Sequence, residues 1–177
     1  MSRFLKLGLI FWCAVSLAGC APHYYNFKLI SKTTNEEEGK LKLIDYNMVA
    51  RHLPGDQVDI FQTVKLVNTS SQELQLNDYS FTAESTVFQY ELSSIIRNNP
   101  SPQDPGKGIV IYDKTSTGKP SIIRISPGDT LDTTLIYKLT RSISEEEFKT
   151  GRKGEHLTIT MQFEKLKYLH KFIAKED

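Results

Sequence analysis

The chain has 177 residues, with 22 lysines and arginines against 21 aspartates and glutamates, so its formal net charge is +1. A nearly neutral chain argues against nucleic acid as the main partner, and this length suffices for one domain with a hydrophobic core. Both cysteines, Cys13 and Cys20, lie near the N-terminus, so the rest of the chain offers neither a disulfide nor thiolate chemistry.

The first residues are typical of a secretory signal. Arg3 and Lys6 form a short basic region, and an almost wholly apolar run follows from Leu7 to Leu17. A permanent membrane-spanning helix needs about 20 apolar residues, so this run is too short to be one. A basic start, a short apolar stretch and small residues at its end predict an export signal that is removed.

The signal ends in Leu17-Ala18-Gly19-Cys20, which resembles the lipobox of bacterial lipoproteins. The resemblance implies that a signal peptidase recognises Leu17, Ala18 and Gly19, cuts before Cys20, and leaves a lipid on that cysteine. Several acyl chains on one residue hold a protein firmly at a membrane. Position 21 is Ala rather than Asp, which by the family's sorting rule implies the periplasmic side of an outer membrane, in a host that has one.

From residue 24 to residue 96 the sequence predicts a succession of short strands. Apolar and polar residues alternate with the period of a half-buried strand, most clearly from Val58 to Leu66. Polar breaks at 33–39, 54–56 and 68–71 separate the runs. A shift of phase at Asn77-Asp78 predicts a bulge or a corner between two sheets.

A loop is predicted at residues 97–108, which contain three prolines and two glycines. A loop of this length inside a compact domain is either functional or mobile, and loops on a rigid scaffold commonly carry binding residues. We therefore expect Arg97, Asn98, Asn99 and Lys107 to belong to a partner-binding loop.

Beyond this loop the sequence predicts further strands at 109–112, 122–125, 131–139 and 157–163, and one short helix before the last of them. Ser144 is a helix-capping residue, and Glu147 three positions later completes the pattern of a capping box. Gly151 and Gly154 are expected to end the helix.

The C-terminal segment leaves alternatives open. Leu166, Leu169 and Phe172 have helical spacing, so residues 164–174 form either a strand extension or a terminal helix. Basic residues also gather here and upstream, at positions 152, 153, 165, 167, 171 and 175. They indicate either a patch for anionic headgroups or an acidic partner, or an exposed edge strand whose lysines oppose aggregation.

Many short strands with almost no helix predict a mainly β fold, an immunoglobulin-like antiparallel β-sandwich with one short helix. The segments VKLVNTSSQELQL and ISPGDTLDTTLIYKL resemble immunoglobulin-like accessory domains of exported bacterial proteins, over residues 58–163. We divide the chain into a signal peptide at 1–19, a lipidated anchor with a tether or first strand at 20–40, and a β-sandwich domain at 41–177.

No residue pattern predicts a catalytic, metal or cofactor site. The histidines at 23, 52, 156 and 170 are scattered, and the acid runs at 36–38 and 145–147 lack the spacing of a calcium loop. Neither a phosphate-binding loop nor a serine-nucleophile motif is present. We therefore expect no enzyme, no metal and no cofactor.

These observations favour a membrane-anchored bacterial lipoprotein that acts as a non-catalytic protein-binding or accessory module of the cell envelope, with an envelope protein as its partner. An immunity lipoprotein that blocks a periplasm-acting toxin is the first alternative, and an envelope hydrolase is the second. A carrier of lipid or another small ligand would require a hollow core.

Overall fold

The computed structural model describes residues 22–34, 40–76, 79–98, 109–113, 122–163 and 166–175, with residues 109–113 described by their backbone alone. The export signal, the lipobox with Cys20, and the loop residues Asn99 and Lys107 lie outside the described residues.

The described chain is mainly β, with one short helix, α2, at Glu145–Gly151. Its strands are β1 (His23–Thr34), β2 (Leu41–Leu53), β3 (Gln57–Asn68), β4 (Leu74–Leu76), β5 (Tyr79–Ser85), β6 (Tyr90–Arg97), β7 (Ile109–Asp113), β8 (Ile123–Ile125), β9 (Thr130–Leu139), β10 (His156–Phe163) and β11 (Leu166–Ala174).

All described strand pairs are antiparallel. Within the described part of the chain they form a nine-stranded sheet, in the order β5-β10-β11-β1-β2-β3-β9-β6-β7, and a two-stranded sheet of β4 and β8. The prediction of a mainly β, antiparallel fold with one short helix is confirmed.

β1 forms the corner of the large sheet. Its first residues, His23–Asn26, pair with β2, whereas Phe27–Thr34 pair with β11. The change of partner falls between Asn26 and Phe27, and the register with β11 then shifts between Leu29 and Ser31. The described sheet therefore begins at His23, within the segment where a tether or first strand is expected.

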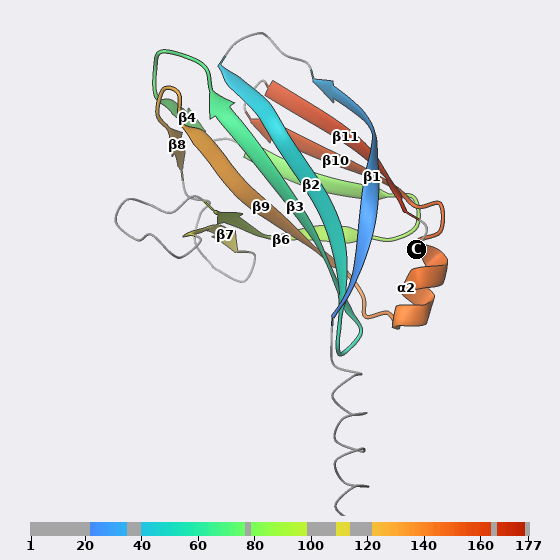
Figure 1. The fold of residues 1–177 in the computed structure, drawn as a ribbon. Coiled ribbons are helices and arrows are strands. Elements are labelled where there is room, and N and C mark those ends of the chain that lie inside the picture. The colour runs from blue at the N-terminus through green and yellow to red at the C-terminus, as the bar shows by residue number, and fades with distance from the viewer. Residues whose placement is uncertain are drawn as a thin grey trace, which may run out of the picture.

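The sheet folds over itself and nearly closes. In Figure 1, β5, β10 and β11 pass behind β2, β3 and β9, and β1 connects the two layers. β5 and β6 stand near opposite ends of the strand order, but they are consecutive in the chain and are bridged by the pair Glu84 and Gln89.

This topology differs from the predicted immunoglobulin-like sandwich. That fold has two separate sheets, whereas here β1 hydrogen-bonds into both layers and makes them one sheet. The alternation of buried and exposed residues identifies which face of a strand is buried. It does not identify the neighbouring strands, and these decide the topology.

The core lies between the two layers and is lined by alternate residues of each strand. β3 buries Val58, Ile60, Val64 and Leu66, in the phase that the sequence predicts. β9, the neighbour of β3, contributes Leu131, Leu135 and Tyr137. From the facing layer, β10 contributes Leu157, Ile159, Met161 and Phe163.

The C-terminal segment is a strand. β11 pairs with β1 on one side and with β10 on the other, and its buried residues are Tyr168, His170, Phe172 and Ala174. The helical spacing of Leu166 and Leu169 does not produce a helix. Pairing with β1 and β10 makes this segment a strand, in which alternate residues are buried. β11 is also an interior strand, so the edge-strand explanation of its lysines is wrong.

α2 begins as the sequence predicts. The Ser144 hydroxyl accepts a hydrogen bond from the Glu147 backbone N–H at 3.2 Å. The side chain of Glu147 pairs with Arg141 at 2.8 Å and so does not complete a capping box. The helix ends at Gly151, and Gly154 has a positive φ of 70°.

Candidate functional site

The described part of the predicted binding loop is fixed to the large sheet. Arg97 is the last residue of β6 and pairs with Thr133 of β9 and Ile109 of β7. Asn98 follows, and its backbone N–H donates to the carbonyl oxygen of Asp132 at 2.8 Å. Its side-chain amide donates to the Asp132 carboxylate at 2.8 Å and to the Thr134 hydroxyl at 2.9 Å.

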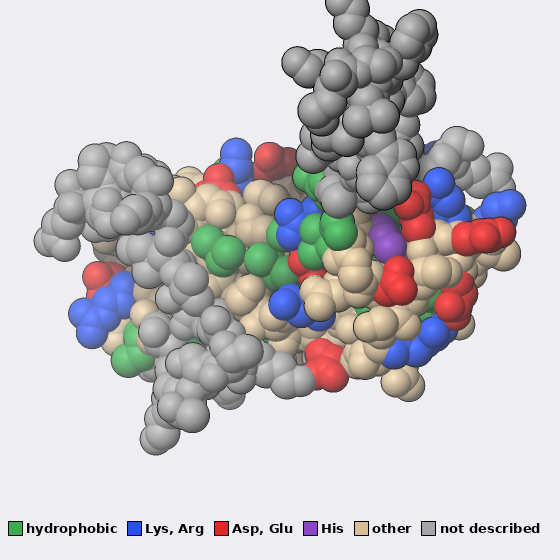
Figure 2. All heavy atoms as spheres, turned by 90° about the horizontal axis from the view of Figure 1, so that it is seen from below, with side chains coloured by type: hydrophobic (Ala, Val, Ile, Leu, Met, Phe, Trp, Pro, Cys, Tyr) green, Lys and Arg blue, Asp and Glu red, His purple; other side chains and the backbone are tan. Residues whose placement is uncertain are grey.

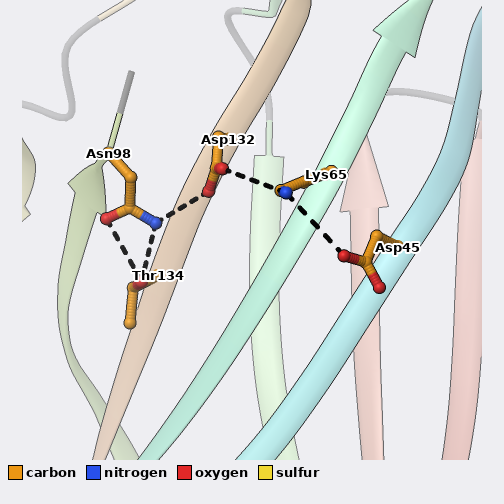
Figure 3. Close-up of polar contacts among 5 residues, drawn as sticks. All are labelled: Asp45, Lys65, Asn98, Asp132 and Thr134. Atoms are coloured by element: carbon orange, nitrogen blue, oxygen red, sulfur yellow. Dashed lines mark hydrogen bonds and ion pairs between the residues drawn. The ribbon is translucent and has the colours of Figure 1, made fainter. Parts of the chain in front are cut away.

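These contacts extend into a charged row across neighbouring strands, shown in Figure 3. The Lys65 ammonium lies 3.7 Å from the Asp132 carboxylate and 3.8 Å from the Asp45 carboxylate. The register places Asp45, Lys65 and Asp132 directly opposite one another on β2, β3 and β9. Exposed ion pairs add little stability, so this row contributes chiefly a pattern of charge on the surface.

An apolar row lies on the same face, four residues away from the charged row along each strand. Val49, Phe61 and Ile136 are cross-strand neighbours, and each is half-buried between fully buried residues of its own strand. The guanidinium of Arg51 stacks over the Phe61 ring at 4.5 Å. We call these two rows together the outer-sheet surface, made of Asp45, Lys65 and Asp132 with Val49, Phe61 and Ile136.

Sequence reasoning found one part of this region and missed the other. It selected Arg97 and Asn98, but not Asp45, Lys65 or Asp132. The outward phase of these residues was readable from the alternation within each strand. Their alignment in one row depends on the register between strands, which a single sequence does not contain.

A second polar cluster ties the start of β1 to α2. One oxygen of the Glu145 carboxylate lies 2.7 Å from His23 Nδ1, and the other accepts from the Tyr25 hydroxyl at 2.9 Å and contacts Lys149 at 3.0 Å. Desolvation acts to raise the pKa of Glu145, but the hydrogen bonds from Lys149, Tyr25 and His23 outweigh it and lower the pKa to about 2.

The loop before α2 is held in the same region, because His52 Nε2 donates to the Ile143 carbonyl oxygen at 2.8 Å. Figure 2 views this end of the molecule from below and shows acidic and basic side chains intermixed on the side where α2 lies in Figure 1. α2 and the start of β1 therefore form one connected end of the domain.

A hollow of about 590 Å³ beside α2 is lined by Glu146, Lys149, Thr150, Arg152, Lys153, Ala174 and Lys175. Arg152 is buried, and its guanidinium stacks on Tyr25 at 4.9 Å and donates to the carbonyl oxygens of Asn26 and Lys175. Its contacts join β1, α2 and the end of β11, so this member of the predicted basic patch has a structural role.

Glu155 is a fully buried carboxyl group. It accepts hydrogen bonds from the Ser85 hydroxyl at 2.6 Å and the Tyr90 hydroxyl at 3.1 Å. Burial raises the pKa of the Glu155 carboxyl above its usual range, although these hydrogen bonds and the charge of Arg152 act to lower it.

Among the described residues, no group of three or more His, Cys, Asp or Glu side chains is arranged to hold a metal ion. Likewise, no helix in the described ranges has both the length and the apolar character needed to cross a membrane.

Comparison with known proteins gives no family for the chain, since no protein-family model and no curated protein matches it. Among solved structures it is similar to an uncharacterized β-sandwich protein from Clostridium difficile 630. That likeness has 17% sequence identity, covers 85% of this chain and 80% of that one, and has a TM-score of 0.39. A likeness of this degree assigns neither a family nor a function.

Proposed function

We propose that this chain is a lipid-anchored, non-catalytic accessory protein of the bacterial cell envelope, and that it binds a protein partner through the outer-sheet surface. One observation carries the binding part of the proposal. On this surface a half-exposed apolar row, Val49, Phe61 and Ile136, runs parallel to a charged row. An apolar centre beside a polar rim is the usual composition of a protein interface.

The charged row would also fix the orientation of a bound partner. Asp45, Lys65 and Asp132 alternate in sign across the strands, and Asn98 is held at the end of the row by its bonds to Asp132. Complementary charges on a partner contribute more to specificity and encounter rate than to affinity. The apolar row supplies the area, and the charged row selects the partner and its orientation.

The anchor part of the proposal rests on the lipobox and on the position of β1 in the chain. His23 begins β1 three residues after Cys20. A chain spans at most about 3.6 Å per residue, so a lipid on Cys20 would hold this end of the domain within about 11 Å of the bilayer surface. Exposed Tyr24 would then lie at headgroup level, where amphipathic aromatic side chains are favoured.

Lipidation is tested with the native protein and a Cys20→Ala variant, by intact mass and by flotation with membranes. We expect the native chain to lose residues 1–19, to gain acyl mass and to float, and the variant to remain an unlipidated precursor. Equal masses after correction for the substitution, and equal flotation, would show that the anchor is absent.

Partner binding is tested by placing a photo-crosslinking amino acid at Thr63, between the apolar and charged rows, in living cells. The control carries the same group at Ile122, an exposed position next to β8 of the two-stranded sheet. We expect one defined crosslinked species from position 63, and we expect Lys65→Glu to abolish it. A species that forms equally from both positions, or that survives Lys65→Glu, contradicts the proposal.

A further inference from the structure

β1 and β2 enclose an opening in the sheet. They pair only through His23–Asn26 and Val49–His52, after which β1 turns to β11 and β2 continues beside β3. Among the described strands, none pairs with Leu41–Met48 of β2 on the side that faces β1. Eight residues of strand at about 3.3 Å each make an edge of about 26 Å. We call this edge of β2, with the facing side of β1, the β1–β2 opening.

Both strands carry an exposed isoleucine within the stretch where they no longer pair with each other. The register of β1 skips Ile30, and that of β2 skips Ile44, so each is the extra residue of a bulge. Each has 52% of its surface exposed, which makes them two of the few large apolar side chains exposed among the described residues. Bulges and lysines commonly protect a sheet edge from pairing with another chain. This protection does not explain two exposed isoleucines beside the edge.

A cavity of about 120 Å³ lies inside the opening, lined by Lys32, Thr33, Thr34, Leu43, Tyr168 and His170. His170 is 1% exposed, and its Nδ1 has no hydrogen-bond partner among the described residues. Burial, with a smaller contribution from the charge of Lys32, lowers the pKa of His170 to about 4, so the ring is neutral at neutral pH. The cavity therefore has an apolar wall at Leu43 and a buried polar atom with capacity for one more bond.

Among the described residues, the rim of the opening is basic. Lys28 and Lys32 on β1 and Lys42 on β2 are exposed around it. Asp45, the acid on this stretch of β2, already contacts Lys65. A strand that enters here would meet backbone donors and acceptors, two isoleucines and an excess of positive charge.

We propose that the β1–β2 opening accepts an extended segment of a partner protein, in which apolar residues alternate with acidic ones. The segment adds to the edge of β2 as a further strand, its backbone bonding to alternate residues of Leu43–Met48, because the Leu41 carbonyl oxygen already accepts from the Tyr168 hydroxyl at 2.6 Å. Its apolar side chains face the cavity wall at Leu43, and its acidic side chains lie on the exposed face, beside the lysines and the two isoleucines. Strand addition of this kind gains affinity from main-chain bonds and selectivity from alternate side chains. This site is separate from the outer-sheet surface, and the inference requires neither that surface nor the lipid anchor.

The test uses the full chain purified in detergent and four synthetic decapeptides with blocked ends. The first alternates Glu and Val, and the second alternates Lys and Val. The other two are the Glu-Val peptide with N-methyl groups on alternate residues, one in each phase. We expect the Glu-Val peptide to bind and to protect amides of Leu43–Met48 from hydrogen exchange. The Lys-Val peptide and at least one N-methylated phase should bind at least tenfold more weakly.

Substitutions in the chain test whether the Glu-Val peptide binds at the β1–β2 opening. Ile44→Asp and Lys42→Glu should each weaken binding of the Glu-Val peptide at least tenfold, whereas Ile122→Asp, at an equally exposed isoleucine elsewhere, should leave it unchanged. Changing Glu36, Glu37 and Glu38 to Gln removes the chain's own acid run and should leave binding equal or tighter.

Three results would overturn the inference. They are no binding of the Glu-Val peptide, equal binding of all the peptides, and protection that falls outside the opening. Weaker binding after the Glu-to-Gln changes would contradict the charge argument in the same way. The crosslinking from position 63 is independent of all these results, so failure here and failure of the proposed function are distinguishable.

Discussion

Glu155 provides the most direct test of how the core is assembled. One carboxyl oxygen accepts from Ser85 and Tyr90, while the other has no hydrogen-bond partner among the described residues. Because burial raises the pKa of this carboxyl, the folded state holds its proton more tightly than the unfolded chain, where the pKa of Glu is about 4.3. Its contribution to stability is therefore complete below about pH 4.3 and is lost as the pH rises through the folded-state pKa.

Two substitutions separate charge from hydrogen bonding. Glu155→Gln keeps a carbonyl acceptor for both hydroxyls and cannot ionise, so it should match the native protein within about 1 kcal/mol at pH 4. As the pH rises, it should become more stable relative to the native protein. Glu155→Ala leaves the Ser85 and Tyr90 hydroxyls without their acceptor, at about 1–3 kcal/mol each, so it should lose about 2 kcal/mol or more at pH 4, where the native carboxyl is protonated.

The assay is urea unfolding of the three proteins at pH 4 and pH 8, followed by circular dichroism. The change in the difference between the native protein and Glu155→Gln reports the pKa shift, at about 1.4 kcal/mol per unit. A difference that stays constant between the two pH values would refute the raised pKa. A Glu155→Ala protein as stable as the native one at pH 4 would refute the role of the two hydrogen bonds.

Three further predictions concern α2. Phe148→Ala should lower the free energy of unfolding in urea by about 3–5 kcal/mol, because this ring is fully buried, and a loss below about 1 kcal/mol would contradict its place in the core. Gly151→Ala would ordinarily stabilise a helix by up to about 1 kcal/mol, but a Cβ here would lie 2.7 Å from the Phe88 ring. We therefore expect a lower melting temperature, and a higher one would show that the ring moves aside without cost. Glu145→Gln should be less stable than the native protein above about pH 4.3, and the difference should vanish as the pH falls toward the folded-state pKa of about 2. A difference that does not change with pH would exclude the carboxylate as its source.

The amino-acid sequence by itself determined the local structure of most of the domain. The alternation from Val58 to Leu66 predicts β3 and its buried face, and both are found. Ser144 predicts the start of α2, and its hydroxyl accepts the expected hydrogen bond. These signals are readable because a strand has a period of two and a helix start leaves backbone N–H groups unpaired, and both properties belong to a few consecutive residues.

Only the tertiary structure decided which strands are neighbours and what lies between them. β1 pairs with β2 and then with β11, and this turns the predicted two sheets into one folded sheet. The same divergence exposes Ile30 and Ile44, and the register of β2, β3 and β9 aligns Asp45, Lys65 and Asp132. The sequence of the C-terminal segment allows either a helix or a strand, and pairing with β1 and β10 decides for the strand β11. Pairing joins residues far apart in the chain, and a shift of one residue exchanges the two faces of a strand, so these outcomes depend on the packing of the whole sheet.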